Sequence, residues 1–190
     1  MKAVVAAVMF AAGLACAPAQ AQVAFIKQDS PCGTQADGYT CITLSPGDFE
    51  PKNLPAYRVR FPGAGKALVS WQGTVTCYAN PRVLFGGGVS RAIYEYYVNL
   101  ALKNDATAFV PNAAGTASVG EKSDLISNNP SVPPPTNPHT ARTPVTLSKL
   151  FNVPAAGVQS FHVLVLPDLR TFGGSSCYIS GGTTIVQYVP

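Results

Sequence analysis

A strictly alternating segment in the first half of the chain restricts the fold more than any other feature. From residue 68 to residue 78 the two sides of the run differ in kind, with Val69, Trp71, Val75 and Cys77 on one side and Ser70, Gln72, Thr74 and Thr76 on the other. A period of two is the pattern of a β-strand with one buried face. Glycine and proline each number 17 of 190 residues and only 12% are charged, which favours a turn-rich β protein over a helical one. The sequence therefore predicts an all-β fold.

Similar short apolar segments, most of them bounded by glycine, proline or asparagine, recur along the chain. They predict strands at 23–27, 39–44, 56–61, 68–78, 145–153, 158–166, 176–180 and 184–189. Residues 91–103 fit two patterns: a strand with Tyr94, Tyr96, Val98, Leu100 and Leu102 on one side, or a helix with a stripe of Ile93, Tyr97 and Leu100. The β-branched and aromatic residues in this segment favour the strand.

A proline-rich segment interrupts this series of strands. Residues 128–144 contain six prolines among 17 residues, and proline cannot donate a hydrogen bond to a β-ladder. We expect a long, exposed and extended loop there. No internal repeat and no change of composition marks a second domain, so residues 22–190 are expected to form one domain.

The first 21 residues have the features of a secretory signal peptide. Lys2 precedes an apolar stretch from residue 3 to residue 15, and Ala19 and Ala21 supply a small-x-small cleavage site. We expect cleavage after Ala21 and a secreted or periplasmic mature protein. A lipid anchor on Cys16 is the alternative, although Gly13 stands where a lipoprotein signal has a branched apolar residue. No later segment is apolar enough to predict a membrane span.

Four cysteines remain after the signal peptide: Cys32, Cys41, Cys77 and Cys177. An even number in an exported protein predicts two disulfides, and four cysteines allow three connectivities. Cys32 and Cys41 flank a turn-like loop, whereas Cys77 and Cys177 each lie on the apolar side of a predicted strand. These patterns favour Cys32–Cys41 and Cys77–Cys177. No CxxC spacing occurs and neither histidine is near a cysteine in sequence, so we expect no metal site.

The charges are few and scattered along the chain. Without Lys2, 12 Lys and Arg face 9 Asp and Glu, and no basic cluster is larger than pairs such as Arg58 and Arg60. Nucleic-acid binding proteins usually carry a concentrated basic surface. We therefore expect no nucleic acid partner.

No set of residues indicates a catalytic site or a cofactor. His139 lies in the proline-rich segment and His162 in an apolar strand, so neither is a favoured base for a hydrolytic triad. The carboxylates considered for glycoside hydrolysis are Asp48, Glu50, Glu95 and Asp168. We expect Asp48 in a turn and Glu95 at a solvated strand position. The glycines at 86–88 lack the lysine of a phosphate loop and predict a turn. Enzymatic activity stays an open, less favoured alternative.

Tyrosines are the strongest candidates for a binding surface. Tyr94, Tyr96 and Tyr97 are grouped, and Tyr78, Tyr178 and Tyr188 lie in other predicted strands. Tyrosine side chains stack on sugars and are common in subunit contacts, although packing within a sheet also accounts for them. We take Tyr94, Tyr96 and Tyr97 as the candidate ligand or interface residues.

Parts of the chain resemble jelly-roll domains of the tumour necrosis factor and complement globular-head type. Residues 143–158, 161–165 and 182–190 look like the closing strands of such domains, and residues 65–75 look like an early core strand. The many short strands, the long polar loop and the two disulfides predict a single β-sandwich or jelly roll. The resemblance implies a jelly-roll-like binding or structural module that often forms trimers, and no catalytic residues carry over. The sequence thus predicts an exported, non-catalytic structural or adhesive module. A lectin-like module that binds surface glycans is the alternative, and a hydrolase is a more distant one.

Overall fold

The computed structural model describes residues 23–28, 42–45, 47–104, 110, 112–132, 134, 138–168 and 175–190. Every regular element in these residues is a β-strand, so the predicted all-β class is confirmed. The described part of the chain has no helix with the length and apolar character needed to cross a membrane. The signal segment and Cys16, Cys32 and Cys41 lie outside the described residues, as does the predicted Cys32–Cys41 disulfide.

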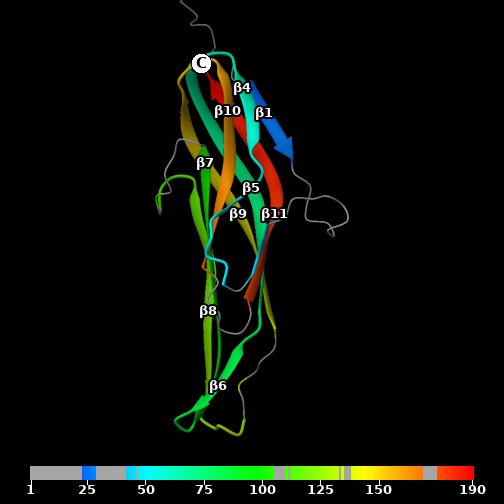
Figure 1. Ribbon diagram of the computed structural model, residues 1–190, viewed down its shortest axis with the longest axis vertical. Helices are drawn as coiled ribbons and strands as arrows, with labels where there is room; N and C mark the ends of the chain where they lie inside the picture. Colours follow the sequence, from blue (N-terminus) through cyan, green and yellow to red (C-terminus); the bar gives the residue numbers. More distant parts are fainter. Residues whose placement is uncertain are drawn as a thin grey trace, which may run out of the picture.

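In the described residues, eleven strands form two antiparallel sheets, here named sheet A and sheet B (Figure 1). Sheet A has the order β1-β11-β5-β9, and β2 also pairs with β11. Sheet B has the order β3-β10-β7-β6, with β4 pairing to β10 and β8 to β7. The strand bounds are β1 Val23–Gln28, β2 Ile42–Leu44, β3 Lys52–Asn53, β4 Tyr57–Phe61, β5 Gly65–Ala79, β6 Arg82–Gly86, β7 Val89–Asn104, β8 Thr116–Ser127, β9 His139–Val153, β10 Gly157–Asp168 and β11 Ser175–Val189.

Eight of the described strands, all except β2, β3 and β6, pair in a nested order. The first of them pairs with the last, β1 with β11, and inside that pair come β4 with β10, β5 with β9 and β7 with β8. The chain therefore runs out through one member of each pair and returns through the other. The ladders between β5, β9 and β11 are long, because β5 pairs with β9 from Gly65 to Ala79.

The inner faces of both sheets share one hydrophobic core. Its largest buried side chains come from sheet A, with Trp71 and Tyr188, and from sheet B, with Phe61, Tyr96 and Phe161. The ring of Phe61 lies 5.1 Å from Tyr188 and 6.2 Å from Phe161, centroid to centroid, so aromatic contacts cross between the sheets. Burial of these faces is the main favourable contribution to folding.

The predicted Cys77–Cys177 disulfide is confirmed. Cys77 lies directly opposite Cys177 in the β5–β11 ladder, and both are buried in the core. The cross-link joins strands whose cysteines are separated by 100 residues in sequence. It therefore fixes an early strand of sheet A to the last strand.

The ambiguous segment 91–103 is a strand, as predicted, within β7. Sequence patterns did not indicate β8, which pairs with β7 over its whole length. Of its 12 residues, TASVGEKSDLIS, most are polar or small, and only Val119 is buried against the core. Pairing with β7 rather than an apolar side explains why this polar segment is a strand.

The prediction of a loop over residues 128–144 is wrong for its last six residues. β9 begins at His139, so residues 139–144 belong to a ladder, and Pro144 pairs with Thr74. Proline is tolerated here because β9 is the edge strand of sheet A, where one side of the strand needs no donor. The first half is not simply solvated either, because the buried hydroxyl of Ser90 donates a 3.1 Å hydrogen bond to the Val132 carbonyl.

Sheet B extends beyond sheet A as a narrow arm made of β6, the start of β7 and the end of β8 (Figure 1). A two-residue turn joins β6 to β7, and its Gly87 and Gly88 have φ values of 60° and 78°. Two successive positive φ values match the twist of a tight hairpin and favour glycine. The predicted glycine turn at 86–88 is therefore confirmed.

Candidate functional site

Glu121 is the centre of a polar cluster at the base of the arm. It lies opposite Tyr96 in the β7–β8 ladder. Its Oε1 accepts a 2.8 Å hydrogen bond from the Tyr94 hydroxyl, and its Oε2 accepts one of 3.1 Å from Tyr96. The Nε2 of His139, at the start of β9, lies 2.9 Å from the same Oε2. Since β9 belongs to sheet A, the carboxylate connects the two sheets.

The same contacts shift the protonation equilibria of the cluster. The Tyr94 hydroxyl, followed by the Tyr96 hydroxyl and the His139 ring nitrogen, holds the pKa of Glu121 below its ordinary value, against an opposing effect of burial. Burial, together with the bond to Glu121, raises the pKa of both Tyr94 and Tyr96. Glu121 is therefore ionised and the tyrosines are neutral donors near neutral pH.

The cluster orders the junction between the sheets. Both oxygens of Glu121 are engaged, and the His139 ring stacks on Tyr94 with a centroid separation of 5.2 Å. Side chains of Glu121 and His139 are each 38% exposed, whereas Tyr96 is 1% exposed. A ligand can therefore approach only the rim of the cluster and has no access to the face of the Tyr96 ring.

The three tyrosines expected to act together are divided between two faces of β7. Tyr94 and Tyr96 point to the core side, and Tyr97 lies on the opposite, outer side, across from Gly120. A Cβ at Gly120 would lie 2.1 Å from Tyr97 Cδ1, so the glycine makes room for the ring. Tyr188 is also unavailable as a surface residue, because it is buried and donates to the Ala64 carbonyl.

The expectation that Glu95 is solvated is wrong. It is 7% exposed although it lies on the outer side of β7, and the ammonium of Lys122, its neighbour on β8, is 3.8 Å away. Asp48 is in a turn, as predicted, where it accepts from the Ser45 amide and from Lys52. His162 is half-buried in β10. Among the described residues no group of three or more His, Cys, Asp or Glu side chains is placed to hold a metal.

The outer face of sheet A is a second candidate site, and it is almost free of charge. The register brings together small polar and apolar side chains from four strands. Between the rows of Leu68 and Tyr78, Arg142 is the single charged residue described on this face. Its other members include Ala24, Ile26, Leu68, Ser70, Gln72, Thr74, Thr76, Tyr78, Thr140, Pro144, Thr146, Ser148, Leu150, Ser176, Tyr178, Ser180, Thr183, Ile185 and Gln187.

The two ends of this face differ in chemistry. Leu68 and Leu150 are neighbours in one row, and Ile26 and Ile185 are neighbours in the next, which gives an aliphatic cluster. At the other end Tyr78 and Tyr178, 46% and 39% exposed, form an edge-to-face pair with centroids 5.7 Å apart. Each tyrosine directly follows a cysteine of the disulfide in sequence, so the cross-link lies beneath the pair.

Sequence reasoning missed Glu121 because it missed the strand that carries it. It noted Tyr78 and Tyr178 but had no means of placing them next to each other, since that contact depends on the β5–β11 register. No family model matches the chain, and no curated protein matches it either.

Proposed function

We propose that this chain is an exported jelly-roll β-sandwich that serves as a structural or adhesive module. The nested strand pairing supports the jelly roll, because pairing first with last and inward from there is how an eight-stranded ribbon wraps into two Greek keys. The same pairing is consistent with the tumour necrosis factor and complement globular-head type. The Cys77–Cys177 cross-link suits an oxidising compartment, and the signal peptide and a Cys32–Cys41 disulfide are parts of this proposal.

The uncharged outer face of sheet A is the observation that carries the functional part. The solvated face of an antiparallel sheet normally consists of polar and charged residues. Charged residues make up about a quarter of an average domain. Four strands at about 4.8 Å and some 11 residues at about 3.4 Å give this face on the order of 700 Å². Each partner in a stable interface contributes about 800 Å². A second copy of this chain, in a trimer, is the occupant that we propose for this face, including its aliphatic cluster.

The mass of the protein in solution tests this assignment. We expect an oligomer by light scattering after size exclusion, and dissociation by Leu68→Asp or Leu150→Asp, because each buries a charge in the contact. Val158→Asp, at an exposed valine on β10 of sheet B, is the matched control. A wild-type monomer over the whole concentration range, or equal dissociation by the control, would refute self-association through sheet A.

A lectin-like function is the second candidate, and the Tyr78–Tyr178 pair favours it. Exposed aromatic rings among hydroxyl groups are suited to stack on sugars, and the same two rows of the sheet supply Thr76, Thr140 and Ser176. A glycan array with wild type and Tyr178→Ala tests this candidate, with Phe85→Ala, an exposed aromatic on the arm, as control. Binding of neutral glycans that is lost only in Tyr178→Ala supports it, and an array without signal rejects it.

A further inference from the structure

Sheet B carries an unpaired basic strip on its outer face. Arg58 and Arg60 project from the same side of β4, and Arg60 pairs with Val158 and Arg58 with Ser160 of β10. Lys103 of β7 pairs with His162, which is two residues further along β10 on that side. The strip, defined as Arg58, Arg60 and Lys103, therefore extends about 14 Å along β10.

Two other cations of the same sheet face have acidic partners. Arg91 is bound to Asp124, and Lys122 has Glu95 as its neighbour. Among the residues that the structure describes, no carboxylate lies within ion-pair distance of Arg58, Arg60 or Lys103. Their positive charges are therefore available to an anionic partner.

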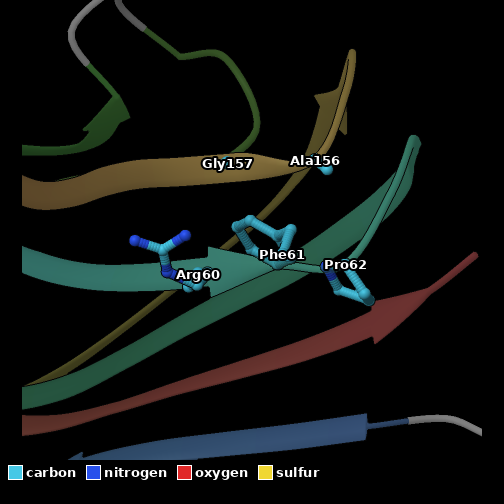
Figure 2. Close-up of a pocket in the computed structure, with 5 residues that line it drawn as sticks. All are labelled: Arg60, Phe61, Pro62, Ala156 and Gly157. Atoms are coloured by element: carbon cyan, nitrogen blue, oxygen red, sulfur yellow. The ribbon is translucent and has the colours of Figure 1, made fainter.

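A hollow of about 460 Å³ lies at the Arg60 end of the strip. Figure 2 shows its lining, which comes from the end of β4 with the following proline and from the start of β10 with the preceding alanine: Arg60, Phe61, Pro62, Ala156 and Gly157. The ring of Phe61 is buried in the core, so Pro62 and Ala156 provide the apolar wall. Arg60 is the one charged residue of the lining, and its guanidinium extends on the side of Gly157 (Figure 2).

We propose that the hollow and the strip bind an acidic polysaccharide, with a carboxylated sugar beside Arg60. A guanidinium matches a carboxylate with two parallel hydrogen bonds, and the apolar face of a sugar ring fits against proline and alanine. Arg58 and Lys103 then meet further carboxylates of the same extended chain. Single-stranded nucleic acid fits less well, because its binding sites add exposed aromatic rings on which bases stack, and the lining side chains offer none.

Calorimetry with an oligogalacturonate on the full mature chain tests the proposal. We expect binding to wild type that weakens as salt is raised, and weakening on the order of tenfold or more in Arg58→Gln/Arg60→Gln, which lacks both guanidinium forks. The matched control is Lys66→Gln/Arg142→Gln, which removes the same charge from the outer face of sheet A. The ligand control is the methyl-esterified oligomer, which keeps the rings and loses the carboxylates.

Three results together support the site: Arg58→Gln/Arg60→Gln binds the oligogalacturonate more weakly, the control variant keeps its binding, and the methyl-esterified oligomer does not bind. Equal weakening in both variants would mean that only net charge matters and would overturn it. The same conclusion would follow from tight binding of the ester or from a duplex or single-stranded DNA that binds more tightly than the oligogalacturonate. This site lies on sheet B, so its result is independent of self-association through sheet A.

Discussion

The two sheets share one core but present opposite surfaces. Between the rows of Leu68 and Tyr78, the outer face of sheet A has Arg142 as its only described charge. The outer side of sheet B includes Arg58, Arg60, Glu95, Lys103, Lys122 and Asp124, with Arg91 on the arm. Both faces belong to antiparallel sheets whose other side is buried, so burial alone does not explain the contrast.

The need to stay soluble explains why a sheet face in water carries charges, but it does not explain a face that carries almost none. A sheet face kept in water usually carries charges, because they disfavour edge and face association between copies. Sheet B meets this requirement, whereas sheet A exposes leucine and isoleucine in adjoining rows at one end and tyrosines at the other. This difference is the reason that we propose sheet A as the contact face and sheet B as the solvent-facing one, apart from its basic strip.

The largest expected effect concerns the cross-link of sheet A. Cys177→Ala should lower the free energy of unfolding by about 4 kcal/mol, because a closed loop of about 100 residues restricts the unfolded chain strongly. Urea unfolding of the oxidised proteins measures the loss. Wild type and variant compared after reduction are the control, and they should unfold at nearly the same urea concentration because neither then has the Cys77–Cys177 cross-link. An oxidised variant as stable as wild type would show that sheet A does not depend on its disulfide.

Glu121→Gln, at the point where the sheets meet, should cause the next largest loss of folding stability. The pKa of Glu121 is lowered in the folded protein from an ordinary 4.5, so its ionised form stabilises the fold above that pH. This stabilisation is lost as pH falls through the lowered pKa. We therefore expect the variant to be less stable than wild type at pH 7 and the two to converge in acid.

Thermal melts across this pH range measure the convergence, with the exposed Glu50→Gln as the matched control. A constant difference between wild type and Glu121→Gln at every pH would contradict the assignment, because a loss of packing alone does not titrate. His139→Gln should share part of the effect at pH 7, since it removes one of the three donors to the carboxylate.

Residue patterns predicted the local structure better than the surfaces. Alternation was sufficient for β5 and β7, and the apolar sides of two strands identified the Cys77–Cys177 pair. Alternation did not reveal β8, because polar residues occur on both of its sides. It also gave no sign that Pro144 lies in a strand, because an edge strand can include a proline. Glu95 was misplaced because its burial depends on the neighbouring strand, which the sequence did not reveal.

The contrast between the two outer faces could not be predicted either, because it also depends on how neighbouring strands pair. Leu68, Leu150 and Ile26 come from three strands, and nothing in the sequence near any one of them indicates the other two. Only the register of three ladders aligns them on one surface. The Glu121 cluster likewise needs β7, β8 and β9 to be placed together, so neither site follows from local sequence.

A smaller effect is expected on the arm of sheet B, where the segment after β8 is attached. Ser90→Ala removes the donor to the Val132 carbonyl, a hydrogen bond worth about 1 kcal/mol. That loss corresponds to roughly 2 to 4 °C in a domain of this size, measured by calorimetry. Ser131→Ala, at an exposed serine of the same segment whose backbone amide bond to Asn129 the substitution leaves in place, is the control. An unchanged melting temperature in Ser90→Ala would mean that the segment does not depend on this contact.

The smallest expected effect tests whether the charges of sheet B stabilise the fold at all. Arg91 and Asp124 form an exposed ion pair on the arm, with side chains 44% and 30% exposed. Water and salt screen such a pair, and holding two long side chains in place costs conformational entropy. Arg91→Gln should therefore shift the melting temperature by no more than about 1 °C, at low salt and at high salt alike. Asp124→Asn and the double variant should behave in the same way.

A drop of about 5 °C that disappears in high salt would show that the charged face of sheet B stabilises the arm rather than keeping it in solvent. The contrast between the two sheets would then have a structural cause, and the uncharged face of sheet A would no longer by itself mark a contact surface.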